Sequence, residues 1–141
     1  MNKNTPVTAI MTPQVIVANP GTKFSQVKRL FLEYTLHHLP VVEEESEKLI
    51  GIVSTHDLMK YFSIHLDELE SVRMDYLDSN CHITELMTKR LITIDATTTI
   101  REVAEIFSHK HFHALPVVEE DRIQGIVTTR DLVQYLYQQY G

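Results

Sequence analysis

The chain is poor in several residue types that would point to particular chemistries. Its 141 residues include one cysteine, Cys81, so no disulfide can form within the chain and no cysteine metal site is indicated. Its four glycines form no glycine-rich loop of the kind that cradles phosphate. The sequence has no apolar run long enough to cross a bilayer, and residues 1–6 lack the apolar core of a signal peptide. We therefore expect a cytoplasmic protein without membrane insertion.

Positive charge is also scarce. Lysine and arginine number 13 against 19 aspartates and glutamates, which gives a net charge of −6. A nucleic-acid-binding surface would need clustered basic residues, so the charge balance argues against that class of partner. A small anionic ligand still fits, because local donors and helix N-termini can offset the overall charge. No arrangement of nucleophile and base indicates an enzyme.

What the sequence does contain is an internal repeat. The stretch LPVVEE at 39–44 recurs at 115–120, and GIVSTHDL at 51–58 recurs as GIVTTRDL at 125–132. The second copy is shorter in the turn near Glu45 and Ser46, as expected for a loop, where deletions are tolerated. A repeat of this length predicts two similar units that pack as a pseudo-symmetric pair.

Each copy reads as strand, helix, strand, strand, helix, which places the fold in the α+β class. Apolar residues at helical spacing predict a helix from Thr22 to about His38, and Thr99 to Glu102 reads as a capping box that starts its counterpart. Residues 67–80 are predicted to form a partly helical surface connection. The remaining predictions are a helical turn at 7–11, strands at 15–17, 39–43, 49–53, 91–94, 115–119 and 122–127, and helices at 57–65 and 131–139.

Both copies carry a hydroxyl residue followed three positions later by an aspartate. These pairs are Ser54 with Asp57 and Thr128 with Asp131, each at a predicted helix start. Three residues are just under one helical turn, so hydroxyl and carboxylate point roughly the same way and could hold the two hydroxyls of a ribose. The alternative is structural: the hydroxyls cap the helices, and the acids favour the helix dipole by about 0.3–1 kcal/mol.

The order of elements, the LPVV and GIVxxxD segments and the repeat itself resemble the CBS domain, named after cystathionine β-synthase. Two tandem copies are similar to a CBS pair, or Bateman module, over nearly the whole chain. The resemblance implies a first unit at 1–66, a linker at 67–82 and a second unit at 83–141. It also implies a pseudo-twofold arrangement of the two units and a disc-like homodimer.

The resemblance further implies a function. CBS pairs bind adenosyl compounds such as AMP, ADP, ATP or S-adenosylmethionine in clefts between units, as regulatory ligands rather than cofactors. They are not enzymes themselves. Because the sequence shows no second domain, we expect a regulatory module that acts on a partner in trans. The alternative is a dimeric interaction scaffold whose clefts bind no ligand.

Residue by residue, the ribose-binding Ser/Thr-x-x-Asp of the family falls on the two pairs described above. Ala114 stands where the family often has a basic residue, a departure that weakens phosphate binding at that site. The other contact positions are His37 and His38 in the first copy, His111 and His113 in the second, Thr12 and Thr88 of the two Met-Thr elements, and Arg130, whose place is taken by His56 in the first copy.

Two further groups of residues have competing interpretations. On a strand, His109, His111 and His113 would share one face and could bind a metal, but the run straddles a predicted helix end and strand start, so we expect no metal site. Alternatively, their protonated rings could stabilise a helix C-terminus, which carries partial negative charge. They could also contact a phosphate in a way that depends on pH, because histidine titrates near neutral pH. The last helix and its counterpart are rich in large apolar residues, which suggests a dimer face, with ordinary core packing as the alternative. These residues are Tyr135, Leu136, Tyr137 and Tyr140, and Met59, Tyr61 and Phe62.

Overall fold

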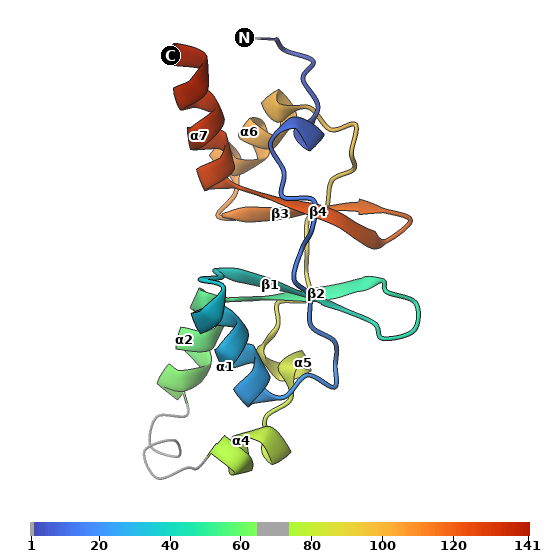
Figure 1. Ribbon diagram of the computed structural model, residues 1–141, viewed down its shortest axis with the longest axis vertical. Helices are drawn as coiled ribbons and strands as arrows, with labels where there is room; N and C mark the ends of the chain where they lie inside the picture. Colours follow the sequence, from blue (N-terminus) through green and yellow to red (C-terminus); the bar gives the residue numbers. More distant parts are fainter. Residues whose placement is uncertain (1, 65–73) are drawn as a thin grey trace. The chain divides into compact units, whose positions relative to one another are not determined.

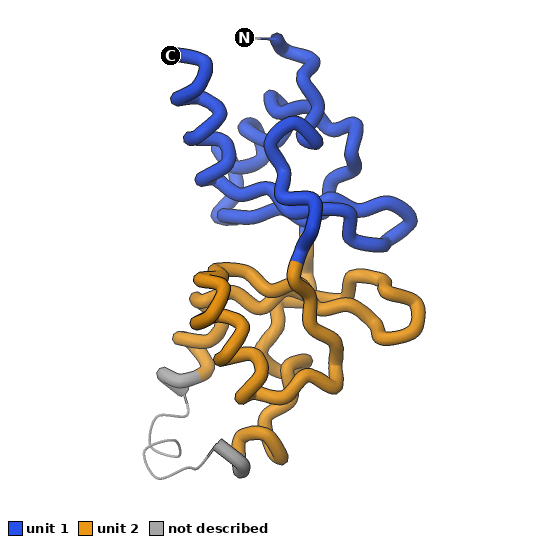
Figure 2. The backbone as a smooth tube through the Cα atoms, viewed as in Figure 1, with its two compact units in different colours: residues 1–15, 92–141 blue, residues 16–91 orange. Residues whose placement is uncertain are grey.

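The computed structural model describes residues 2–64 and 74–141 and confirms the mixed α+β class (Figure 1). The chain divides into two compact units, one of residues 16–91 and one of residues 1–15 with 92–141 (Figure 2). The described elements are, in chain order, η1 (Val7–Ala9), α1 (Phe24–Glu33), β1 (His38–Val42), β2 (Leu49–Ser54), α2 (Thr55–Ile64), α4 (Met74–Asn80), α5 (Ile83–Leu86), α6 (Ile100–His109), β3 (Ala114–Glu119), β4 (Arg122–Thr128) and α7 (Thr129–Tyr140).

The compact units differ from the sequence repeats, because the N-terminal segment packs with the second copy. The backbone N–H of Val7 donates to the carbonyl of Thr98 at 2.7 Å, and that of Ile100 donates to Thr5 at 2.9 Å. The segment containing η1, the helical turn expected at 7–11, is thereby tied to the start of α6. The boundaries at 1–66, 67–82 and 83–141 remain a prediction about the repeat.

Each unit contains one antiparallel hairpin built in the same way. Leu39 pairs with Val53 and Val41 with Gly51 in β1–β2, and β3–β4 repeats this register with a bulge at the equivalent position. Leu39, Val41 and Val53 are fully buried. In each unit the helices before and after the hairpin cover the same face of it (Figure 1). Burial of that face explains why apolar residues dominate the hairpin strands.

The strands predicted at 15–17 and 91–94 are wrong. Residues 15–17 form no strand, and only a single bridge follows them at Ala18, while 91–94 forms a single bridge at Ile94. Ala18 pairs in parallel with Val41, and Ile94 pairs with Val117. Both segments run directly into a turn: the one after Ala18 is closed by Thr22 N–H donating to the Asn19 carbonyl at 2.9 Å. The chain therefore leaves the sheet after one residue pair.

The first helix also ends before the predicted His38. Tyr34 follows the last helical residue, and Thr35 has a φ of 51°, in the left-handed region where a right-handed helix cannot continue. The capping box predicted at the start of α6 is confirmed. The Glu102 N–H donates to Thr99 Oγ1 at 3.1 Å, and the Thr99 N–H donates to Glu102 Oε2 at 2.9 Å.

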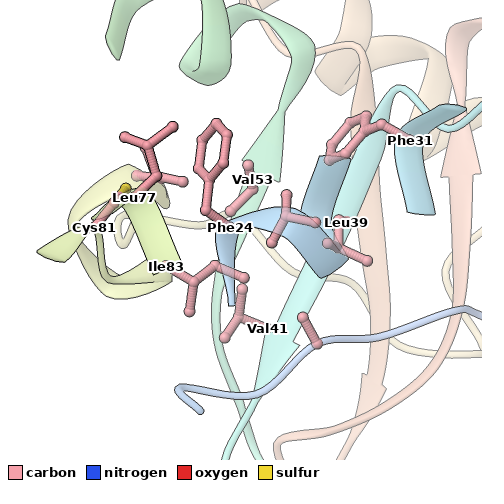
Figure 3. Packing of buried hydrophobic residues seen from close by; sticks show 11 residues of the cluster. Phe24, Phe31, Leu39, Val41, Val53, Leu77, Cys81 and Ile83 are labelled. Atoms are coloured by element: carbon pink, nitrogen blue, oxygen red, sulfur yellow. The ribbon is translucent and has the colours of Figure 1, made fainter. Parts of the chain in front are cut away.

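The core of the unit formed by residues 16–91 lies between α1, the hairpin, α4 and the segment that follows α4. Phe24, Val27 and Phe31 of α1 follow helical spacing and are buried. Figure 3 shows Leu77 and Cys81 gathered beside Phe24 and Ile83. The other unit has a separate core, whose buried residues are Val7, Ile94, Val103, Leu115, Val117 and Val127.

The expectation of a surface connection at 67–80 is wrong at its C-terminal end. Leu77 on α4 is 7% exposed and belongs to the core. Asp78 accepts hydrogen bonds from the Ser25 N–H at 2.8 Å and from Ser25 Oγ at 2.7 Å. A residue of α4 thus supplies an acceptor for an N–H group in the first turn of α1, which has no partner within its own helix. The acidic residues Asp67, Glu68 and Glu70 lie outside the described residues.

In the described part of the chain, no helix has both the length and the apolar character needed to cross a bilayer.

The contact between Asp78 and Ser25 predicts sensitivity to acid. The backbone and side-chain hydrogen bonds from Ser25 hold the pKa of Asp78 below its usual value of 3.8. A lowered folded-state pKa stabilises the fold above the unfolded-state value, and this contribution is lost as the pH falls through the folded-state pKa. Asp78→Asn should therefore flatten the decline in unfolding free energy between about pH 5 and pH 2, measured by urea denaturation.

The matched control is Asp121→Asn, a change at an exposed hairpin residue. Its backbone has a φ of 66°, which asparagine tolerates. This control should keep the pH profile of the parent protein. Parallel profiles for Asp78→Asn and the parent would contradict the role given to Asp78.

Candidate functional site

The first candidate site is formed by Ser54, Asp57 and Thr88 in the unit of residues 16–91. Ser54 ends β2 and Asp57 lies in the first turn of α2. The Asp57 N–H donates to Ser54 Oγ at 3.0 Å, and the Ser54 N–H donates to Asp57 Oδ2 at 2.9 Å. The two residues thus form a reciprocal cap, as in a capping box.

The second candidate site is formed by Thr128, Asp131 and Thr12 in the other unit. The Asp131 N–H donates to Thr128 Oγ1 at 3.3 Å, and the Thr128 N–H donates to Asp131 Oδ2 at 2.8 Å. The structural interpretation of these hydroxyls as helix caps is therefore confirmed in both copies. This capping role is compatible with the ligand-binding interpretation, because both carboxylates are half-buried rather than fully enclosed.

Each site receives its threonine from the opposite sequence copy. In the first site Thr88 and Ile52 exchange backbone hydrogen bonds at 2.8 and 3.0 Å, and Thr88 Oγ1 donates to Asp57. In the second site Thr12 and Ile126 exchange the same pair of bonds at 2.9 and 3.0 Å. Sequence reasoning missed this exchange, because the repeat looks the same whichever copy supplies the Met-Thr element.

Gly51 and Gly125 make these backbone crossings possible. A Cβ on Gly51 would lie 2.5 Å from Met87 Sδ, and one on Gly125 would lie 2.9 Å from the Thr12 carbonyl oxygen. Real side chains do not approach so closely, so only glycine lets the Met-Thr segment cross the hairpin. The sequence signal for these crossings is the glycine itself, which stands three residues before the hydroxyl residue in both copies.

The predicted histidines come close to the same helix starts through their backbone. The Thr55 N–H donates to the His37 carbonyl and the Thr129 N–H donates to the His113 carbonyl, both at 3.0 Å. The side chains of His37 and His113 are exposed, as are those of His56 and Arg130 in the first turns of α2 and α7. Each unit therefore brings one histidine, one hydroxyl, one aspartate and one Met-Thr threonine to the same end of its hairpin.

The run of His109, His111 and His113 spans the end of α6 and the start of β3, as predicted. Among the residues that the structure describes, no three histidine, cysteine or acidic side chains gather as a metal site would require. That the protein binds no metal stays a prediction. Cys81 is buried, and that burial raises the pKa of its thiol.

The comparisons also find two copies of one domain in this chain. The family model for the CBS domain matches residues 7–64 and 83–138. The chain belongs to the CBS domain family. The resemblance seen in the sequence and the CBS-pair fold are therefore confirmed.

Individual relatives agree with this CBS-pair fold. Protein MJ1225 of Methanocaldococcus jannaschii is 30% identical over 96% of this chain and 48% of its own length. Its crystal structure gives a TM-score of 0.82. The CBS domain pair of protein MJ0100, solved with 5′-methylthioadenosine and S-adenosyl-L-methionine, gives a TM-score of 0.75 at 26% identity and covers 94% of this chain and 99% of that one.

Other relatives are much longer proteins. The homoserine O-acetyltransferase of Methanohalobium evestigatum is 31% identical over 92% of this chain but only 24% of its own length. The chain thus spans about half of MJ1225 and about a quarter of the transferase. What is shared with the transferase is one segment of that protein.

The crossings predict that Gly125→Ala destabilises the protein more than Gly51→Ala. At both glycines the nearest atom is the sulfur of a flexible methionine, Met87 at 2.5 Å from a Cβ on Gly51 and Met11 at 2.7 Å from one on Gly125. The backbone oxygen behind it is closer at Gly125, where Thr12 O lies at 2.9 Å, than at Gly51, where Thr88 O lies at 3.1 Å. Overpacking of this kind costs about 1–3 kcal/mol, and a side chain yields more cheaply than a backbone. The measurement is the free energy of unfolding from urea denaturation.

Adding Met87→Ala to Gly51→Ala should recover part of the loss, while Met11→Ala should recover less of the Gly125→Ala loss. Gly21→Ala, in an exposed turn, is the control and should change stability least. Equal losses at Gly51 and Gly125 would contradict this explanation of the two glycines.

Proposed function

We propose that this CBS pair is a regulatory module that binds an adenosyl ligand and acts on a partner protein in trans. The ligand class is AMP, ADP, ATP or S-adenosylmethionine. The observation that carries the proposal is the duplicated, half-buried carboxylate of Asp57 and Asp131, each locked at a helix start beside a hydroxyl. The ligands bound by the MJ0100 pair support the same class.

The geometry suits a ribose. A carboxylate only accepts hydrogen bonds, and a ribose offers two neighbouring hydroxyl donors. Hydrogen bonds to a charged acceptor are about twice as strong as neutral ones. In the proposed mode the ribose donates to Asp57 or Asp131, the base lies near Thr88 or Thr12, and phosphates meet the helix N-terminus with His37, His113 or Arg130.

Regulation would follow from a difference in ligand affinity between two arrangements of the protein, because a ligand shifts an equilibrium only by that difference. We propose no catalytic activity and no cofactor. The enzymes among the relatives match this chain over 24% of the transferase and 21% of an inosine-5′-monophosphate dehydrogenase. A cytoplasmic location, with neither nucleic acid nor membrane as partner, is part of the proposal.

The proposal includes a homodimer, supported by an apolar stripe on α7. Val133, Leu136, Tyr137 and Tyr140 are 66%, 44%, 78% and 83% exposed and fall on one helix face by their spacing. Met59, at the position of Val133 in the first copy, is 71% exposed. Tyr135 and Tyr61, also expected on this face, are half-buried, and the side chain of Phe62 lies outside the described residues. The same stripe is what favours the rival function, a ligand-free interaction scaffold.

Ligand binding can be tested by thermal stability. A ligand that binds only the folded state raises stability, by about 2.7 kcal/mol at 100 times its Kd. We expect at least one of AMP, ADP, ATP and S-adenosylmethionine to raise Tm, and Asp57→Asn with Asp131→Asn to remove the effect. Asparagine keeps an acceptor for the Ser54 and Thr128 N–H groups, so the double variant should still fold. Failure of all four compounds to raise Tm would leave the scaffold as the function.

The dimer can be tested separately by sedimentation. Val133→Glu with Tyr137→Glu places two charges on the stripe and should convert the dimer to a monomer, because burying unpaired charge is costly. Gln134→Glu with Gln138→Glu adds the same charge to exposed positions off the stripe and should leave the mass unchanged. A Val133/Tyr137 variant with the parent mass would exclude this face as the dimer interface.

A further inference from the structure

We propose that the two candidate sites are unequal: the second site, at Asp131, fills first, and Thr88 acts as an internal competitor at the first site. This inference rests on the proposed function, since it concerns how the same ligand class distributes between the two sites. It makes Thr88 a residue that sets relative affinity.

At the first site both carboxylate oxygens of Asp57 already accept hydrogen bonds. Thr88 Oγ1 lies 3.0 Å from Oδ1 and 3.2 Å from Oδ2 and donates to the carboxylate. The Ser54 N–H donates to Oδ2 at 2.9 Å. The Thr88 hydroxyl therefore makes the same kind of contact that a ribose hydroxyl would make. A ligand at this site must displace it.

At the second site the carboxylate is engaged on one side only. Asp131 Oδ2 accepts from the Thr128 N–H at 2.8 Å and from Thr128 Oγ1 at 3.0 Å. Within residues 2–64 and 74–141, no hydrogen bond reaches Asp131 Oδ1. Thr12 has the same backbone pairing as Thr88, with Ile126 in place of Ile52, yet its hydroxyl makes no bond to Asp131 in this part of the chain.

The charges beside the two sites differ in the same direction. Arg130, next to Asp131, carries a permanent positive charge and five donors, whereas His56 takes that place at the first site. His38 offers the first site an extra nitrogen where the second has Ala114, but His38 is half-buried and already has an interaction partner. Arg130 and the Asp131 carboxylate, which is engaged on one side only, therefore both favour the second site for a nucleotide with a phosphate, and the missing basic residue at Ala114 acts in the opposite direction.

The four glycines of the chain allow each site to be followed separately. Gly51 lies three residues before Ser54 and Gly125 three residues before Thr128, while Gly21 and Gly141 supply reference signals. Protein labelled with ¹⁵N only at glycine, titrated with AMP, should show the Gly125 signal saturating at about tenfold lower ligand concentration than Gly51. Tenfold corresponds to one net hydrogen bond to a charged group.

Variants then assign the cause. Thr88→Val removes the competing hydroxyl at nearly constant volume and should lower the Gly51 midpoint by about tenfold. Asp131→Asn should abolish the ligand-induced shift of the Gly125 signal and leave that of Gly51. Thr93→Val, an exposed threonine outside both sites, is the matched control and should change neither midpoint. If Thr88→Val disturbs the glycine signals before ligand is added, Thr88→Ala replaces it.

The outcomes separate the inference from the proposed function. Equal midpoints for Gly51 and Gly125, a lower midpoint for Gly51 than for Gly125, or an unchanged Gly51 midpoint in the Thr88 variants would overturn the inequality of the sites. If neither the Gly51 nor the Gly125 signal shifts when AMP, ADP, ATP or S-adenosylmethionine is added, ligand binding itself is overturned.

Discussion

The backbone pairing between each Met-Thr segment and a hairpin is the contact on which the rest of the structure depends. The bonds between Thr12 and Ile126, and between Thr88 and Ile52, tie one end of each sequence copy to the hairpin of the other. They require a glycine in the strand below, since a Cβ there would overlap the crossing segment. They also decide which threonine stands beside which aspartate. Topology and site composition therefore have one physical cause.

The hydroxyl–carboxylate pairs show why structural and functional roles are hard to separate at a helix start. The bonds between Thr128 and Asp131 satisfy N–H groups that a helix leaves unpaired, so the pair stabilises α7 without any ligand. The carboxylate of Asp131 uses only Oδ2 in these bonds, and within the described residues no hydrogen bond reaches Oδ1. Replacing it by alanine would remove both roles at once, whereas asparagine retains the cap acceptor and changes only what a ligand meets.

Much of the fold followed from the sequence, for identifiable reasons. The LPVV and GIV segments are buried hairpin strands, and the capping box at Thr99 and Glu102 marked the start of α6 correctly. What failed depended on contacts distant in sequence or on a single backbone angle. Residues 15–17 form no strand, and only Ala18 pairs with the sheet before a turn begins. Helix α1 ends where Thr35 adopts a left-handed backbone conformation, and Leu77 is buried in the core although no local sequence pattern predicts it. The exchange of Met-Thr segments could not be predicted, because the two copies are so similar that either Met-Thr segment could pair with either hairpin.

Duplication supplies two sites with the same backbone, and the side chains then make them different. Hairpin register and crossing bonds are reproduced in both units, so the geometry available to a ligand is set twice by the same rules. In the proposed binding mode, the hydrogen bond from Thr88 to Asp57, and Arg130 in place of His56, would separate the affinities of the two sites without altering the fold. A module with one ready site and one internally occupied site responds over a wider range of ligand concentration than two equal sites would, because the second site to fill does so only after its own threonine gives way. Conversion of that graded occupancy into a signal needs a ligand-dependent change at a surface that a partner contacts, and the exposed apolar stripe of α7 begins directly after the hydroxyl–carboxylate pair of the site at Asp131.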